Sequence, residues 1–222
     1  MRGLAASLVL ALAGVAGVAA QERCPGVDAV IRASEPEDLQ AGCQGAAAAV
    51  RFLAANGFDT AQPLEIHFVD VMPDSIPGPT LGCFVRPMKR IYMLAGKNCI
   101  GRVLKYDIVV DAELHMGLVA HEVAHWIASH NFGNRRPSHV AQEYIAYVTM
   151  YASMPAAARN QVLMKIPGKG FGSEREITLT VYLLDPVRFG AQAYRHFRKP
   201  GKGAPFLQRV LKGQSLAQDN PP

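Results

Sequence analysis

The chain has 222 residues, of which 50% are hydrophobic and 18% are charged. This balance is that of an ordinary globular chain and excludes a disordered one, and the length suits one domain with a sizeable core. The net charge of +5 is mild, and basic residues are too rarely interleaved with aromatic ones to indicate a nucleic-acid-binding protein.

The first 20 residues predict a cleaved export signal. Arg2 provides a positive start, residues 4–18 form an apolar stretch, and small residues precede a cleavage site before Gln21. No later stretch reaches the roughly 18 apolar residues of a membrane span, so we expect an exported periplasmic or extracellular protein without an integral membrane segment after cleavage. The mature chain is expected to be one domain over residues 21–213, followed by a disordered tail at 214–222.

Four cysteines in an exported chain predict two disulfides. We expect the pairs Cys24–Cys43 and Cys83–Cys99, because each pair joins neighbouring predicted elements. A cysteine-rich zinc site is disfavoured, since the sequence contains no two cysteines separated by two residues.

The first half of the mature chain predicts strands around one long helix. Ser34 to Glu37 form a candidate capping box that opens an alanine-rich helix, and Gly57 ends it. Alternation of apolar residues and turn signals predict strands at 27–33, 64–70, 80–87 and 90–94, the last two as an antiparallel pair.

The second half predicts helices only. Asp111 is the expected N-cap of a helix over residues 112–131, and Ser138 caps a helix that runs to about residue 153. Further helices are expected at 155–164, 174–184, 186–197 and 204–212. The order indicates an α+β fold, with a small mixed sheet and a backing helix followed by an all-helical C-terminal half.

The helix at 112–131 contains the sequence HEVAH at residues 121–125, which fits the pattern H-E-x-x-H. Residues i and i+4 share one helix face, so His121 and His125 can converge on one Zn²⁺. Glu122 lies about 100° round the helix, too far to be a ligand but placed to act as general base on a water held by the metal. The alternative is a pair of hydrogen-bonded core histidines, which the apolar surroundings disfavour because buried polar groups are costly without partners.

A third ligand has to come from outside this helix. The metzincin arrangement needs Gly and His three and six residues after His125, where the sequence has Ala128 and Asn131. Glu143 lies on the next predicted helix, and small residues on both helices would let them approach closely. We therefore predict Glu143 as the third ligand, with His139 as the first substitute.

These motifs resemble those of the zincin superfamily and, within it, the gluzincins. More closely, HEVAHWIASHN followed by QEYIAYVTMYASMP is similar to a family of small exported bacterial proteins of uncharacterised function with a zincin-like core. The resemblance implies a zincin-like fold, one zinc at His121, His125 and Glu143, and Glu122 as the base. The chain departs from the thermolysin-like pattern after Glu143, and the candidates for a carboxylate that supports a ligand histidine are Asp111, Glu174 and Asp185.

We expect an exported zinc metallopeptidase acting on peptides or proteins, with the substrate along the sheet edge near residues 90–94. The candidate side chains for stabilising an oxyanion are Tyr147, Tyr182, Tyr194 and His196. Two alternatives stay open: a catalytically inactive, zinc-stabilised binding or chaperone-like protein, and a disulfide-held structural domain without metal. The sequence carries no signal for an oligomeric state.

Overall fold

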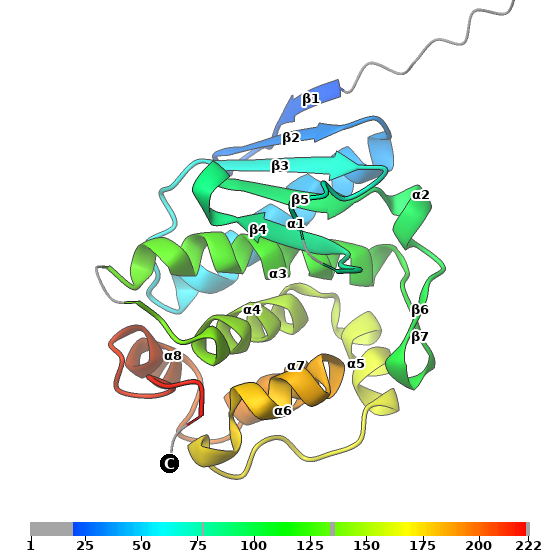
Figure 1. Cartoon of the computed structure of the whole chain (residues 1–222). Coiled ribbons are helices and arrows are strands. Elements are labelled where there is room, and N and C mark those ends of the chain that lie inside the picture. Colours follow the sequence, from blue (N-terminus) through cyan, green and yellow to red (C-terminus); the bar gives the residue numbers. More distant parts are fainter. Residues whose placement is uncertain (1–19, 77, 134–135, 221–222) are drawn as a thin grey trace, which may run out of the picture.

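Five strands form one mixed sheet in the N-terminal half of the chain (Figure 1). The computed structural model describes residues 20–76, 78–133 and 136–220. The strands are β1 (Ala20–Arg23), β2 (Ala29–Ala33), β3 (Leu64–Val69), β4 (Gly82–Val85) and β5 (Arg90–Leu94). In the order β1-β2-β3-β5-β4, the three central strands run parallel, and β1 and β4 are antiparallel edge strands.

The strands expected from the sequence are thereby confirmed, and β1 is an addition. Sequence patterning did not indicate β1 because all four of its residues are exposed and it has no apolar alternation. The export signal expected at residues 1–20 lies outside the described residues apart from Ala20.

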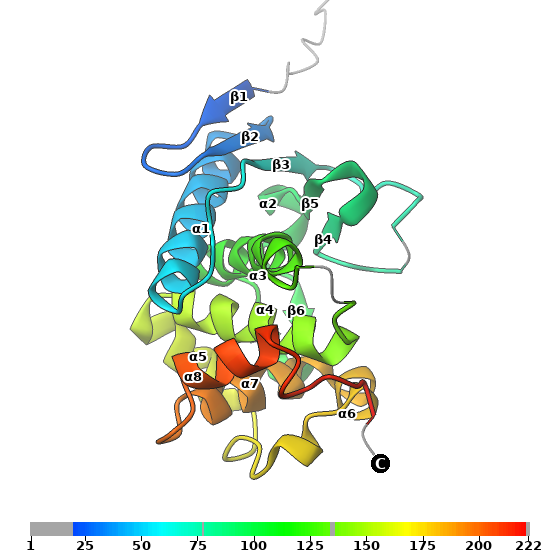
Figure 2. The same ribbon diagram turned by 90° about the vertical axis from the view of Figure 1, so that its left-hand side faces the viewer.

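The sheet buries one of its faces against helices α1 (Pro36–Ala55) and α3 (Ala112–Asn131), which Figure 2 shows on the same side of the strands. Strand β3 alternates as a half-buried strand should, with Leu64, Ile66 and Phe68 buried between partly exposed residues. The two helices meet at Gly45, where a Cβ atom would lie 2.8 Å from the backbone oxygen of Met116. This contact requires glycine and fixes α3 beneath the sheet.

The helix caps confirm two expectations and correct one. Asp111 Oδ1 accepts the Leu114 amide at 2.8 Å and begins α3. Ser138 Oγ accepts the Ala141 amide at 3.1 Å and begins α4 (His139–Ser153). The capping box expected at Ser34 is wrong: the N-cap residue of α1 is Glu35, and it makes no side-chain cap bond.

The C-terminal half is helical, as expected (Figure 1). The single helix expected at 174–184 is instead a 3₁₀ turn at Glu174–Glu176 and a separate short helix, because Thr178 provides a new cap by accepting the Val181 amide. The remaining elements are α2 (Gly96–Cys99), the hairpin β6 (Val103–Leu104) and β7 (Ile108–Val109), α5 (Ala156–Lys165), α6 (Leu179–Leu184), α7 (Pro186–Phe197) and α8 (Ala204–Leu211). Within the described ranges, no helix combines the length and hydropathy that crossing a membrane requires.

One of the two expected disulfides forms. Cys24 and Cys43 are bonded and tie the start of the sheet to α1. The predicted pair Cys83–Cys99 is wrong, since both side chains are free thiols. The register explains the error: Cys83 lies opposite Tyr92 within the β4–β5 pair, whereas the chain continues beyond the end of β5 into α2, where Cys99 is fully buried.

The segment expected as a disordered tail packs against the helical half over its described residues, 214–220. Ser215 and Leu216 are buried. Ser215 Oγ donates to Glu174 at 2.9 Å, and the Leu216 carbonyl accepts Ser138 Oγ at 2.5 Å. The Val140 amide donates a hydrogen bond to the Asp219 side chain, so this segment is bound to the N-terminal end of α4.

Candidate metal centre

The two histidines of the H-E-x-x-H pattern lie on one face of α3, and their Nε2 atoms face each other. His121 Nε2 and His125 Nε2 are 3.1 Å apart, and the ring centroids are 4.8 Å apart. Their spacing of four residues places them one helical turn apart, so the helix itself sets this geometry. His121 is buried, and the His125 side chain is only 13% exposed.

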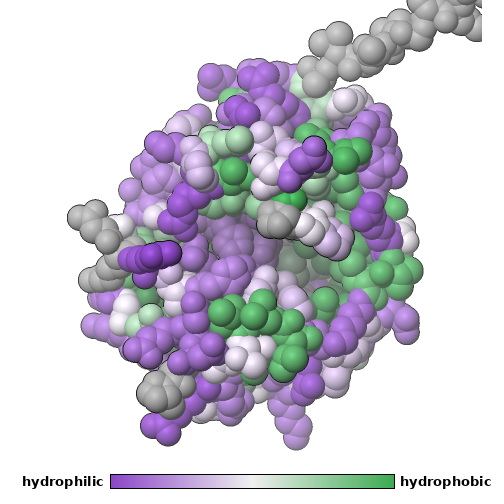
Figure 3. Space-filling view, viewed as in Figure 1, coloured by the Kyte–Doolittle hydropathy of each residue, from purple (hydrophilic) through white to green (hydrophobic). Residues whose placement is uncertain are grey.

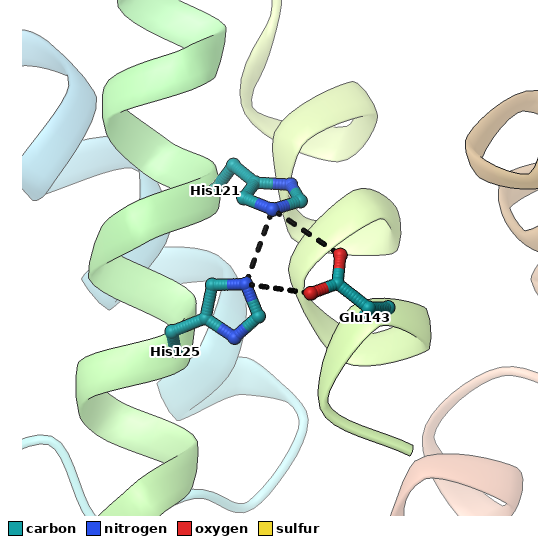
Figure 4. A group of neighbouring side chains, drawn as sticks. All are labelled: His121, His125 and Glu143. Carbon is teal, nitrogen blue, oxygen red and sulfur yellow. Dashed lines mark hydrogen bonds and ion pairs between the residues drawn. The ribbon is translucent and has the colours of Figure 1, made fainter. Parts of the chain in front are cut away.

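Glu143 completes the group from α4, as predicted. Its Oε2 lies 3.6 Å from His121 Nε2, and its Oε1 lies 3.5 Å from His125 Nε2 (Figure 4). Ala120 and Ala124 on α3 and Ala146 on α4 are fully buried, which lets the two helices approach closely. The three ligand atoms all lie within 4.8 Å of one another and could hold a metal ion.

Burial shifts the pKa values of the candidate histidine and glutamate ligands in opposite directions. It lowers the pKa of His121 well below its usual value and the pKa of His125 to about 4, with the charges of His139 and Arg86 adding to the effect on His125. Burial, followed by the charge of Glu122, raises the pKa of Glu143 to about 8. The imidazoles are therefore neutral, the form that binds a metal, and burial favours the protonated form of the Glu143 carboxyl.

Glu122 lies beside this group of three residues, and its carboxylate contacts strand β4 instead. Its Oε2 accepts the Phe84 amide of β4 at 2.9 Å, which leaves Oε1 without a described partner. Burial raises the pKa of Glu122 to about 8, and the Phe84 hydrogen bond opposes this. The strand can approach so closely because position 82 is glycine: a Cβ there would lie 2.9 Å from Glu122 Cγ.

The group opens into a cleft of about 550 Å³ between β4 and the helical half. In Figure 3 this cleft is a hollow with a hydrophilic floor, and an apolar patch borders it below, over α6. The residues that line the cleft are Pro79, Thr80, Leu81, Gly82, Cys83, Phe84, Arg86, Leu104, Leu118, His121, Glu122, His125, His139, Gln142, Glu143, Tyr147, Tyr182 and Pro186.

Two of the four oxyanion candidates lie in this cleft. Tyr147 packs edge-on against the His121 ring with centroids 4.5 Å apart, and Tyr182 hydrogen-bonds to Glu143. Burial raises the pKa of both hydroxyls, so both stay protonated and able to donate. The other two lie elsewhere: His196 Nδ1 is 2.7 Å from the Tyr144 hydroxyl, and Tyr194 packs against Tyr151.

His139, expected as the substitute ligand, lies at the mouth of the cleft. Its Nε2 is 3.5 Å from Glu143 Oε1, and its side chain is 50% exposed. It therefore approaches the same carboxylate from the solvent side, whereas Glu143 itself faces the two buried rings.

The three carboxylates considered as supports for a ligand histidine are all engaged away from the group. Asp111 caps α3, Asp185 pairs with Lys105 and Tyr106, and Glu174 pairs with Lys202 and Arg209. Among the described residues, the Nδ1 atom of His121 is buried and has no hydrogen-bond partner.

The structure also corrects the sheet edge expected near residues 90–94 and shows residues that patterning missed. Strand β5 is paired on both sides, by β3 and β4, so the edge strand on this side of the sheet is β4. Gly82, the Phe84 amide and Arg86 therefore join the site. Their only signal in the sequence was their position in the predicted hairpin, which does not state which strand is outermost.

The chain belongs to the family described as "Family of unknown function (DUF6639)", whose model matches residues 29–220. The match spans strands β2 to β7 and all the described helices, and therefore contains the whole candidate metal centre. Neither a curated protein nor a solved structure matches the chain.

Proposed function

We propose that the chain is an exported zinc-dependent hydrolase, most specifically a metallopeptidase, which binds one zinc through His121, His125 and Glu143. The observation that carries this proposal is the convergence of two imidazole nitrogens and a buried carboxylate in a cleft that also contains Glu122. The resemblance of the H-E-x-x-H and downstream glutamate to the gluzincin pattern supports the same assignment and a zincin-like arrangement of the fold.

The choice of zinc follows from the donor set. Two imidazoles and one carboxylate are a ligand combination of catalytic zinc sites, which leave a fourth position open. The donors fit a divalent cation, because burial keeps the two histidines neutral, and because burial and the charge of Glu122 raise the pKa of Glu143, a shift that a cation would oppose. A cation there would lower the pKa of both Glu143 and Glu122 and stabilise their ionised forms.

Zinc bound at such a site lowers the pKa of water towards neutrality and polarises the scissile carbonyl. Glu122 accepts the proton of the attacking water and delivers it to the leaving amine nitrogen. The Phe84 amide orients the Glu122 carboxylate by holding Oε2, so Oε1 remains to exchange the proton. Tyr147 provides a protonated hydroxyl in the cleft for the oxygen that gains negative charge.

Strand β4 offers the place for the substrate. It is the outermost strand next to the cleft, and an extended peptide can add to such an edge through main-chain groups other than the Phe84 amide, which is bonded to Glu122. The disulfide Cys24–Cys43 is compatible with export, since disulfides persist in oxidising compartments.

The test uses the exported, mature chain without chelator. We expect one zinc per chain by elemental analysis, and cleavage of members of a broad peptide library that stops when a chelator is added and resumes with zinc. A folded chain that contains no zinc would overturn the metal assignment. A zinc-loaded chain that cleaves no peptide would overturn the hydrolase assignment and favour the zinc-stabilised binding protein.

A further inference from the structure

The cleft has two chemically different ends. On α3, Leu118 lies about one turn before His121, and His125 lies one turn after it. The lining residues Leu81, Leu104, Leu118 and Pro186 form an apolar end, and Arg86, His139 and Gln142 form a polar end, with the metal centre between them. Leu81 precedes β4 and Arg86 follows it, so the strand spans the two ends over about 16 Å at roughly 3.3 Å per residue.

Arg86 lines the cleft and has no ion-pair partner among the described residues. The carboxyl groups in the described lining are those of Glu122 and Glu143, and a divalent cation bound there would cancel the combined charge of their ionised forms. The guanidinium of Arg86 donates to the neutral Gln142 Oε1 at 2.8 Å, and no ion pair to a carboxylate is present in the described parts of the chain. A guanidinium has five N–H donors and Arg86 is exposed at the cleft, so donors beyond the one bonded to Gln142 remain for a ligand.

Strand direction determines which part of a bound peptide meets Arg86. Strand β4 runs from Gly82, next to the apolar end, to Val85, next to Arg86. A peptide that pairs antiparallel to β4, the more stable kind of ladder, therefore runs from the Arg86 end to the apolar end. Its amino-terminal part lies over Arg86, and its carboxyl-terminal part lies over Leu104 and Leu118.

We propose that Arg86 makes the cleft selective for peptides that carry an Asp or Glu side chain on the amino-terminal side of the bond facing the metal centre, with an apolar residue on the other side. The inference rests on the proposed function for its metal-centred cleft, and it concerns peptide binding, which can be measured without turnover. An arginine and a carboxylate form charge-assisted, often bidentate hydrogen bonds, so we expect a preference of about tenfold for Glu over Gln.

The experiment measures equilibrium binding of fluorescent peptides to zinc-loaded, full-length Glu122→Gln protein. The peptides differ only in Glu, Gln or Lys at the position over Arg86, and each is made with a free and an amidated C-terminus. We expect the Glu peptide to bind about tenfold more tightly than the Gln peptide with either C-terminus, and the ratio to shrink as salt screens the charges. Arg86→Gln should bring the ratio to about one, and Arg86→Glu should favour the Lys peptide.

The matched control is Lys89→Gln. Lys89 is an exposed cation three residues from Arg86 that does not line the cleft, so this variant should keep the Glu preference. A Glu preference that survives Arg86→Gln, or no preference in the parent protein, would overturn the inference. A preference that depends on a free C-terminus would also overturn it, because the terminal carboxylate and not a side chain would then be recognised.

These binding data, together with cleavage rates of the same peptides by the zinc-loaded parent protein, separate this inference from the proposed function. An Arg86-dependent Glu preference in a chain that cleaves no peptide would support the inference and contradict the hydrolase assignment. Cleavage of Glu and Gln peptides with equal kcat/KM and equal binding would support the hydrolase assignment and contradict the inference.

Discussion

Helix α3 buries His115 near its N-terminal end and His121 near its middle. The ring of His115 has a hydrogen-bond partner on the main chain, whereas one ring nitrogen of His121 has none among the described residues. His115 Nε2 donates to the Leu94 carbonyl at 3.0 Å, at the point where β5 ends. His121 Nδ1 has no partner among the described residues, and its Nε2 faces another histidine and a carboxylate. The two positions have similar burial, so the contrast lies in what completes them: a backbone carbonyl for His115 and, as we propose, a metal ion for His121.

The comparison shows how a structural buried histidine differs from a candidate ligand. A hydrogen bond to a main-chain oxygen fixes the ring of His115. Around His121, two neutral rings face a carboxylate whose pKa is raised to about 8, an arrangement that gains stability when a cation binds. The contrast can be tested at both positions.

The largest expected effect is on catalysis. Glu122→Gln keeps the size of the side chain and its hydrogen bond to the Phe84 amide, but it removes the group that accepts a proton. We expect zinc content to stay at one per chain and peptide hydrolysis to fall by at least ~10²–10⁴-fold, the usual contribution of a general base. Elemental analysis and steady-state rates on the same preparation check this, and an unchanged rate at full zinc occupancy would contradict the mechanism.

The next effect is on metal affinity. Glu143→Gln replaces an anionic ligand with a neutral one, so we expect zinc affinity to fall by more than about 100-fold, beyond the effect typical of residues that only support a ligand. Competition with a chelator of known affinity measures it. His139→Gln is the control, since the exposed His139 touches the same carboxylate and should change affinity far less. Equal losses in the two variants would show that His139 is also a ligand.

A third effect is a pH dependence of the metal-free protein. Glu122 and Glu143 have folded-state pKa values of about 8, above their unfolded values, so the folded chain binds more protons and loses stability as pH rises towards 8. His121 and His125 have lowered pKa values in the folded chain, so below about pH 6.5 they make the folded chain more stable as pH rises. Between pH 6.5 and 8 we therefore expect the metal-free chain to lose stability with rising pH.

Urea denaturation at the two pH values measures this loss. The zinc-loaded protein should show a smaller change, because the cation already keeps the carboxylates ionised. The metal-free double variant Glu122→Gln, Glu143→Gln should show the smallest change of all. A slope that is the same in the metal-free parent and in the double variant would place its origin in other groups.

The smallest effect belongs to the structural histidine. His115→Leu leaves the buried Leu94 carbonyl without its donor, and we expect a loss of about 1–3 kcal/mol in the free energy of unfolding. The loss should be the same with and without zinc, and zinc content should not change. A loss of zinc in this variant would contradict the separation between the two ends of α3.

Local patterns in the sequence sufficed for most of the elements and for the centre of the site. The spacing of His121 and His125 follows from the helical repeat, and the caps at Asp111 and Ser138 depend on residues three positions apart. Glu143 was predictable because the two helices are consecutive in the chain and carry small residues where they meet.

Contacts between distant segments were decided by the tertiary structure. The sequence alone determined most of the helices and strands, the Cys24–Cys43 bond and the group His121, His125 and Glu143, because each rests on local periodicity or on neighbouring elements. Only the folded chain decided that β4 is the edge strand beside the cleft and that Cys83 and Cys99 stay apart. It also decided that Tyr147 and Tyr182 reach the cleft whereas Tyr194 and His196 do not. The packing of residues 214–220 on α4 was likewise decided by the tertiary structure. The physical reason is that strand order, register and helix packing are set by complementary surfaces far apart in sequence, for which local patterns carry no signal.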